Sequence, residues 1–216
     1  LDTFGGGIAN QNGSLTVTGS TFSGNYARNG FGGGIANYAG TLTVTNSTFD
    51  SNSADHDGGG IVSDFLSTST ITGSTFTDNR ASTTISLGGG IFNGGAMTII
   101  NSTLSGNNAV NSGGGIFNDG GTITITNTTI VGNSAPAGGG GIANAGTVYL
   151  GNSILFDHSV GGDCIGIPVV HVAPNIGCMG DFTGDPLLGA LTGSPAYYPL
   201  LPGSAAIDAG DNSLCP

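Results

Sequence analysis

Lysine, glutamate and tryptophan are absent from this chain of 216 residues, and its only strongly basic residues are Arg28 and Arg80. All 13 acidic residues are aspartate, so the formal net charge at neutral pH is −11. Nucleic acids and anionic membrane surfaces bind proteins through clusters of basic side chains. We therefore expect no nucleic-acid partner and no electrostatic attachment to a membrane.

Long apolar runs are missing as well. A transmembrane helix needs a run of about 18 or more apolar residues, and none occurs, so we expect no membrane span. The chain has neither an initiator methionine nor a signal peptide, and Leu1 falls inside a repeat. We interpret the chain as a processed or trimmed part of a longer precursor.

Glycine, by contrast, is abundant at 43 residues, and it recurs with a fixed period. Six Gly-Gly-Gly-Ile runs end at isoleucines that are 27, 26, 30, 25 and 26 residues apart. A period of this length without a helical phase is typical of one coil of a β-solenoid. The runs are Gly5–Ile8, Gly32–Ile35, Gly58–Ile61, Gly88–Ile91, Gly113–Ile116 and Gly139–Ile142.

Each repeat also contains an alternating segment such as Leu15–Thr18 and a shorter one centred on Phe22 or its equivalent. This alternation predicts strands with one buried face and one exposed face. Glycine or asparagine stands between the two segments, as at Gly19 and Asn46, and both tolerate the left-handed backbone of a corner. We predict an all-β fold, a right-handed parallel β-helix with three sheets and about six to seven rungs of 25–30 residues.

Asparagine recurs at two fixed places in the repeat, one shortly after each glycine run and one three residues after the phenylalanine of the third strand. Stacked coils place equivalent residues above one another, so we expect two ladders of side-chain amides inside the turns. The first is Asn10, Asn37, Asn93, Asn118 and Asn144, with Ser63 as the exception, and the second is Asn25, Asn52, Asn79, Asn107 and Asn133.

Threonine alternates with apolar residues on the second strand of each repeat and should form an exposed ladder on a flat face. Such an array resembles the ice-binding faces of some β-solenoids, although threonine is also favoured in any exposed strand. Both interpretations stay open. The ladder is Thr16, Thr18, Thr43, Thr45, Thr70, Thr72, Thr124 and Thr126.

Three asparagines, Asn46, Asn101 and Asn127, match the N-glycosylation pattern. They stand at the predicted corner, where the repeat itself requires asparagine. The repeat therefore explains the pattern as well as glycosylation does.

The glycine runs, together with segments such as Phe22–Asn25, resemble the GGA[ILV]/FxxN repeats of polymorphic outer-membrane adhesins. The segments Asp185–Gly189 and Leu200–Asp211 resemble the C-terminal part of secreted bacterial right-handed parallel β-helix repeat or choice-of-anchor proteins, except that Ala205 replaces the usual proline. The resemblance implies an exported protein that is held at, or assembled on, the cell surface.

After about residue 152 the repeat decays, which suggests β-helix repeats over residues 1–158 and a capping or docking tail over residues 159–216. In an exported protein, Cys164 and Cys178 would form a disulfide that closes the end of the solenoid, and free buried thiols are the alternative. Cys215 has no evident partner within the chain.

Catalytic groups are harder to find. The densest acidic group is Asp50, Asp55, Asp57 and Asp64 with His56, and the pectinase-type acidic motifs are missing. We expect solvated aspartates in turns, with calcium at Asp55 and Asp57 as the minor alternative. We expect no catalytic residue, no cofactor and no resident metal.

The leading hypothesis is a non-enzymatic extracellular structural protein whose subunits assemble head to tail into a filament or sheath. The first alternative is an adhesin that binds glycans or proteins on neighbouring surfaces. The second is a carbohydrate-active enzyme, a lyase or hydrolase. A cleft lined by three or more converging carboxylates would favour the enzyme, since glycosidases act with paired carboxylates.

Overall fold

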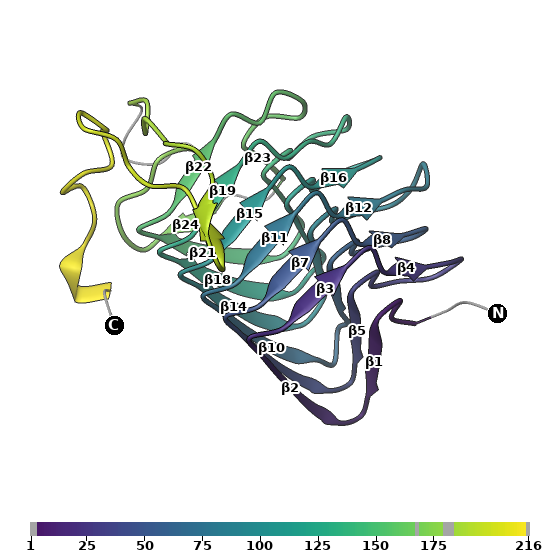
Figure 1. The fold of residues 1–216 in the computed structure, drawn as a ribbon. Helices are drawn as coiled ribbons and strands as arrows, with labels where there is room; N and C mark the ends of the chain where they lie inside the picture. The colour runs from purple at the N-terminus through teal and green to yellow at the C-terminus, as the bar shows by residue number, and fades with distance from the viewer. Residues whose placement is uncertain (1–3, 167–168, 179–183, 215–216) are drawn as a thin grey trace.

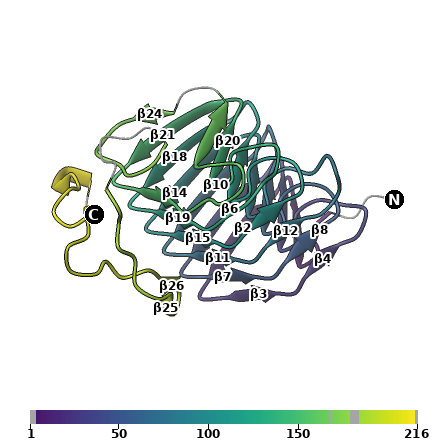
Figure 2. The same ribbon diagram turned by 90° about the horizontal axis from the view of Figure 1, so that it is seen from above.

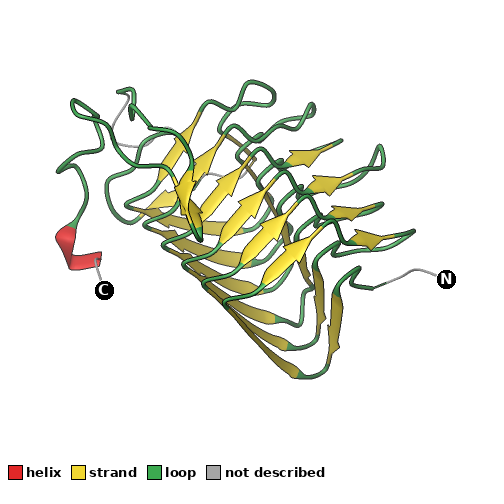
Figure 3. Cartoon of the chain, viewed as in Figure 1, coloured by secondary structure: helices red, strands yellow, loops and turns green. Residues whose placement is uncertain are grey.

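The computed structural model describes residues 4–166, 169–178 and 184–214. Its strands stack in parallel into a β-solenoid, and the only described helix is one short turn at Asn212–Leu214 (Figure 3). In Figure 1 the N-terminal coil lies nearest the viewer, and the chain winds clockwise as it recedes. The solenoid is therefore right-handed, as parallel strand connections favour. The predicted fold class is confirmed.

The first two sheets each contain seven parallel strands, all in register from coil to coil. The first sheet is β1 (Ile8–Gln11), β5 (Ile35–Tyr38), β9 (Ile61–Ser63), β13 (Ile91–Asn93), β17 (Ile116–Asn118), β20 (Ile142–Asn144) and β23 (Cys164–Gly166). The second sheet is β2 (Ser14–Thr18), β6 (Thr41–Thr45), β10 (Thr68–Thr72), β14 (Ala96–Ile100), β18 (Thr122–Thr126), β21 (Thr147–Gly151) and β24 (Val170–His171).

The third sheet has six strands. A fourth sheet, made of four two-residue strands, follows it in the first four coils and leads to the next coil. The sequence pattern did not predict this fourth sheet. The third sheet is β3 (Thr21–Ser23), β7 (Thr48–Asp50), β11 (Thr75–Thr77), β15 (Thr103–Ser105), β19 (Thr129–Val131) and β22 (Ile154–Phe156). The fourth is β4 (Tyr26–Ala27), β8 (Ser53–Ala54), β12 (Arg80–Ala81) and β16 (Asn108–Ala109). We number the coils 1–7 by their first-sheet strands.

Inward-facing side chains form continuous columns through the stack. The isoleucines that end the glycine runs make one column, and Ile35, Ile61, Ile91, Ile116 and Ile142 are fully buried. In another column the rings of Phe22 and Phe49 stack at 4.8 Å, and those of Phe49 and Phe76 at 4.6 Å. Register therefore converts the sequence period into one hydrophobic core, because each inward residue lies over its own equivalent.

The corner between the second and third sheets requires a left-handed backbone. Its residues have positive φ angles, among them 48° at Asn46, 58° at Gly73 and 51° at Asn127. Glycine adopts this conformation without steric cost, and asparagine tolerates it better than most residues.

The second glycine of each glycine run serves a different need, because a fourth-sheet strand or its equivalent crosses directly over it. At Gly59, an added Cβ would overlap the backbone of Arg80 and the carbonyl oxygen of Gly89 in the next coil. The side chains of Ala54 and Ala81, from β8 and β12, are fully buried beside this crossing. Only glycine leaves room for two backbones so close together.

The C-terminal region closes the far end of the solenoid. β23 and β24 continue the first two sheets past residue 158, and Ile176 bridges to Ile154 of the third sheet. Cys164 and Cys178 form the expected disulfide, with their Cα atoms 5.2 Å apart. Cys215 lies outside the described residues.

The tail then turns back along the outside of the third sheet. Its hairpin, β25 (Thr192–Gly193) and β26 (Ala196–Tyr197), lies beside that sheet (Figure 2). The Thr75 hydroxyl donates to the carbonyl of Ala196 at 2.8 Å, and the hydroxyls of Ser105 and Tyr198 are 2.7 Å apart. The tail therefore covers the middle of the outer face of the third sheet, around β11 and β15.

We predict that Gly59→Ala lowers the free energy of unfolding by about 3 kcal/mol or more, because overpacking with a backbone shift is among the costlier substitutions. The matched control is Gly24→Ala, where φ is +63° but nothing lies within 4 Å of the added Cβ. Its cost should be only about 1–2 kcal/mol of backbone strain. Denaturant unfolding followed by circular dichroism measures both, and equal losses would contradict the close-crossing explanation.

Candidate functional site

The second asparagine file forms an unbroken ladder from Asn25 to Asn133. Asn79 is representative and fully buried. Its Nδ2 donates to Asn107 Oδ1 and to the carbonyl of Phe49, both at 2.9 Å. Its Oδ1 accepts from the side chain and the backbone amide of Asn52, at 2.9 and 3.1 Å. Each internal asparagine of the ladder thus satisfies buried groups in both neighbouring coils.

In coil 6 a histidine takes the place of asparagine in this file. His158 Nε2 lies 3.5 Å from the Nδ2 of Asn133, and its Nδ1 lies 2.9 Å from Asp163 Oδ1. The His158 side chain is fully buried. Its position indicates a structural role for His158.

The first asparagine file is broken in coil 3. Asn10 donates to Asn37 at 2.7 Å, and Asn93, Asn118 and Asn144 continue the series at 2.8 and 2.9 Å. Between these two parts stands Ser63, whose hydroxyl pairs with that of Ser69 at 2.8 Å. As a result, the buried Oδ1 of Asn93 has no hydrogen-bond partner among the described groups.

A third ladder escaped the sequence analysis, although its signal, a hydroxyl residue directly after each corner, recurs in every repeat. The backbone amide of Ser47 donates to Ser74 Oγ at 3.1 Å, and that of Ser74 donates to Ser102 Oγ at 3.2 Å. The hydroxyl of Ser74 in turn donates to the carbonyl of Thr72 at 3.0 Å. Hydroxyl side chains therefore bridge successive coils at the corner, as the amides do elsewhere.

The threonines of the second sheet alternate with buried or half-buried residues and are partly or fully exposed, and further residues widen the array. Thr98 fills the gap between Thr70 and Thr124, and a further outward file stands at the start of each strand. That file is Ser14, Thr41, Thr68, Ala96, Thr122 and Thr147.

Three outward files result. Neighbouring residues within a file are about 4.8 Å apart, and neighbouring files are about 7 Å apart along the strand. The files that contain Thr16 and Thr18 continue through Thr43, Thr45, Thr70, Thr72, Thr124 and Thr126 and change only at Ile100, Tyr149 and Gly151. Aspartate, arginine and histidine are absent from the three files over β2 to β21. We call this surface the threonine face.

The possible glycosylation sites differ in their accessibility. Asn46 and Asn101 are exposed at the corner. The Nδ2 of Asn127, by contrast, donates to the carbonyl of Leu214 at 3.1 Å, beneath the tail. Attachment at Asn127 would require this part of the tail to move.

Asp55 and Asp57, which the sequence suggests for calcium, bind separate parts of the chain. Asp55 accepts hydrogen bonds from the Tyr26 hydroxyl at 2.6 Å and the Asn29 amide at 2.7 Å. The Tyr26 hydrogen bond is the main reason that the pKa of Asp55 is lowered. Asp57 Oδ1 accepts from the Leu87 amide at 2.8 Å. Nowhere in the described ranges do three His, Cys, Asp or Glu side chains gather closely enough to hold a metal ion.

The outer face of the first sheet carries a groove of about 380 Å³. Val62 and Phe92, only 3% and 8% exposed, line its buried part. The ring of Phe4 packs edge-on against Tyr38, with centroids 4.6 Å apart and planes at 71°, and lies nearly parallel to Phe31 at 6.3 Å. Aromatic rings in two nearly perpendicular orientations therefore line the groove.

Three carboxylates line the same groove, namely Asp57, Asp64 and Asp119. Asp64 is held by the amides of Ala39 and Leu66, at 3.0 and 3.2 Å, and by the hydroxyl of Ser67. The Asp119 carboxylate accepts no hydrogen bond within the described part of the chain. Asp57 and Asp64 stand out in the sequence as part of an acidic group, whereas Asp119 and the aromatic residues lie in different coils and carry no such signal.

Burial gives Asp57 unusual electrostatics. The pKa of its carboxyl is raised to about 6, mainly by desolvation and to a smaller extent by the charge of Asp119, against the lowering effects of the Leu87 amide and of His56. His56 stacks on the ring of Phe31 at 4.9 Å. The ionised form of Asp57 is therefore destabilised at neutral pH, and the groove lining contains no Arg or Lys to offset this.

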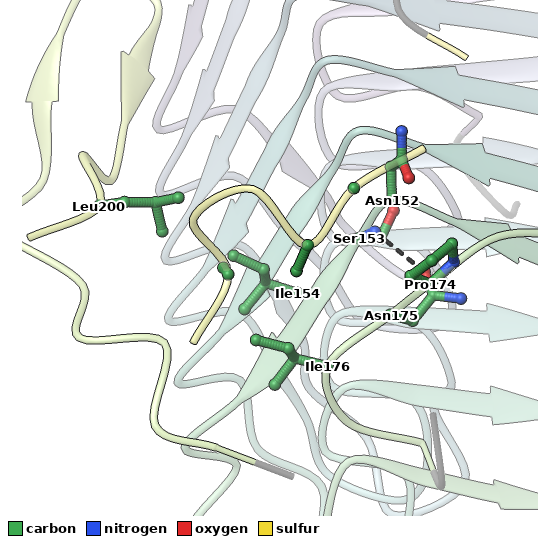
Figure 4. A pocket seen from close by; sticks show the side chains of 10 residues that line it. Asn152, Ser153, Ile154, Pro174, Asn175, Ile176 and Leu200 are labelled. Atoms are coloured by element: carbon green, nitrogen blue, oxygen red, sulfur yellow. Dashed lines mark hydrogen bonds between the residues drawn. The ribbon is translucent and has the colours of Figure 1, made fainter. Parts of the chain in front are cut away.

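A second, smaller hollow of about 140 Å³ lies where the tail crosses the last complete coil. Ile154, Ile176 and Leu200 line it, and the backbone amide of Ser153 donates to Asn175 Oδ1 at 2.9 Å (Figure 4). Asn152 holds the tail in place, because its side chain both donates to and accepts from the backbone of Asp211 at 2.8 and 2.7 Å. We assign this hollow to tail packing.

The broken ladder yields a stability prediction. Ser69 stands in the core column between Leu42 and Met97, so Ser63→Asn with Ser69→Leu restores both the ladder and the column. The double variant should gain about 1–3 kcal/mol in the free energy of unfolding, since the buried Asn93 oxygen regains a donor. Ser69→Leu alone leaves the Ser63 hydroxyl without its partner. A double-mutant cycle by denaturant unfolding tests the coupling, and strictly additive effects would contradict it.

Asp57 yields a prediction about pH. Its pKa is higher in the folded protein than the ordinary value of 3.8, so the folded state holds the proton more tightly and loses stability as pH rises from about 4 to 6. Asp57→Asn removes the buried charge and keeps an acceptor for the Leu87 amide. The variant should melt at a higher temperature than the parent at pH 8, and the difference should disappear below pH 4. A gain that is independent of pH would contradict this explanation.

Comparison with known proteins adds one match. The profile of the Chlamydia polymorphic membrane protein repeat matches residues 46–64, which include Phe49–Asn52 and the glycine run Gly58–Ile61. No curated protein sequence and no solved structure matches the chain. None of the described helices is long and apolar enough to cross a membrane. In this segment, then, the chain is similar to repeats of a polymorphic outer-membrane-type protein.

Proposed function

We propose that this protein is a non-enzymatic, adhesin-like β-solenoid exposed on a bacterial surface, and that it binds its partner through a lateral face. The observation that carries the proposal is the repeat match over residues 46–64. The matched segment contains a corner, a third-sheet strand, an asparagine of the buried ladder and a glycine run, so it spans most of one structural unit. Surface exposure is proposed from the same match.

The distribution of covered and open faces supports lateral binding. The tail covers the middle of the third sheet, where Thr75 and Thr103 are only 1% and 4% exposed. The first and second sheets carry the groove and the threonine face, and no described tail hydrogen bond reaches the outward threonines. A rigid, repetitive, uncharged face is suited to contact an extended partner, because little conformational entropy is lost on binding.

Head-to-tail assembly into a filament stays a prediction. The described tail residues bond to their own solenoid, at Thr75, Ser105 and Asn152 among other places. A tail that is occupied in this way gives no support to docking on the next subunit. We therefore place adhesion ahead of the filament.

A carbohydrate-active enzyme is the second candidate, and one observation favours it. Asp57, with its raised pKa, shares the groove with Asp119 and Asp64, and glycosidases pair a carboxylic acid of raised pKa with an ionised carboxylate. Release of reducing ends from neutral polysaccharides, abolished by Asp57→Asn, would establish this candidate in place of the adhesin.

Adhesion can be measured directly with protein-coated beads. Beads that carry the full chain should bind to cultured epithelial cells or to a glycan-coated surface several times more than albumin-coated beads, and soluble protein should compete. Thr70→Arg with Thr124→Arg places two charges on the threonine face and should reduce adhesion if that face makes the contact. Asp78→Arg, an exposed site beyond the third sheet, is the control. Binding no greater than that of albumin would overturn the proposal.

A further inference from the structure

The groove on the first sheet has the size and composition of a small-ligand site. Its volume of about 380 Å³ falls within the range of about 300–1,000 Å³ that is typical of ligand pockets, which are mainly apolar with a few converging polar groups. Phe65, at the mouth, exposes 64% of its surface, and Phe4 exposes 39%. Large aromatic side chains are thus held open to solvent beside a partly buried carboxylate.

The charge of the groove restricts its occupant. Asp57, Asp64 and Asp119 line it, and Arg, Lys and His are missing from the described lining. The whole chain has only two arginines and no lysine, so it has few cations with which to neutralise these carboxylates. A phosphate or uronic acid would be repelled, whereas an organic cation would be attracted.

The aromatic rings restrict the occupant further. The faces of aromatic rings attract cations, most strongly where water is excluded, and boxes of rings recognise quaternary ammonium groups. Here Tyr38 stands at 71° to Phe4, while Phe31 lies nearly parallel to Phe4. A compact metal ion would instead need a tight cluster of acidic or histidine ligands, which the described residues do not form.

We propose that this groove binds a quaternary ammonium group of the size of choline, enclosed by the rings of Phe4, Tyr38 and Phe65 and neutralised by Asp57 and Asp119. The proposal rests on the proposed function, since it names the chemical group that the adhesin-like solenoid recognises. Asp64 is fixed by its own loop and positions Phe65 through the hydrogen bonds around Leu66 and Ser67.

The test is calorimetric titration of the full chain with choline and with 3,3-dimethyl-1-butanol, its uncharged analogue of the same shape. Choline should bind at least about tenfold more tightly, which corresponds to about 1.4 kcal/mol. Asp119→Asn and Phe65→Ala should each weaken choline binding several-fold. Asp78→Asn removes the same charge from an exposed site outside the groove and should leave the affinity unchanged.

Three results would overturn the proposal: no choline binding at millimolar concentration, equal binding of the uncharged analogue, or an equal loss in Asp78→Asn and Asp119→Asn. Circular dichroism of each variant checks that the solenoid is intact. We expect it to be intact in both aspartate variants, because these substitutions change surface-facing groups. Beads that adhere without choline affinity would refute this inference and keep the adhesin. Choline affinity without bead adhesion would refute the adhesin and keep the choline site.

Discussion

This structure depends on one constraint: the buried polar groups at the corners of each coil must find hydrogen-bond partners in the next coil. The amide of Asn79 alone bonds to Asn52, Phe49 and Asn107, so it joins three successive coils. A buried polar group without a partner lowers the free energy of unfolding by about as much as several hydrogen bonds contribute. A slip of one residue between coils would break every such bond at once and turn the apolar columns toward solvent. The ladders therefore fix the register, and the core columns and outer faces follow from it.

Fixed register leaves the outward positions free to differ from sheet to sheet. On the second sheet they are threonine in nearly every coil. On the third sheet some of them contact the tail, and on the first sheet they include Val62, Phe92 and Phe117. The interior is nearly the same in each coil, so the information that distinguishes one face from another lies outside. This division explains why we place recognition on the lateral faces.

The break in the first ladder coincides with the groove. Coil 3 replaces the usual asparagine with Ser63 and follows it with the loop Asp64–Ser67, which carries both a groove carboxylate and Phe65. The loop is held by bonds from Leu66 and Ser67 to Asp64, while Asn93 above it keeps an oxygen without a partner. Stability is lost at the place where the surface departs from the repeat, which is a common property of binding sites.

The sequence by itself determined the period, the parallel coils, the core columns and the file positions of the asparagines. These follow from local rules, because a strand exposes alternate residues and a stack repeats them. The disulfide partners were expected from the exported context. The two-residue strands of the fourth sheet were too short to show a pattern, and the tail has no period from which its path could be derived. The groove was decided by the tertiary structure alone. Phe4, Tyr38, Asp57, Phe92 and Asp119 come from five coils, and only stacking brings them together and buries Asp57 enough to raise its pKa.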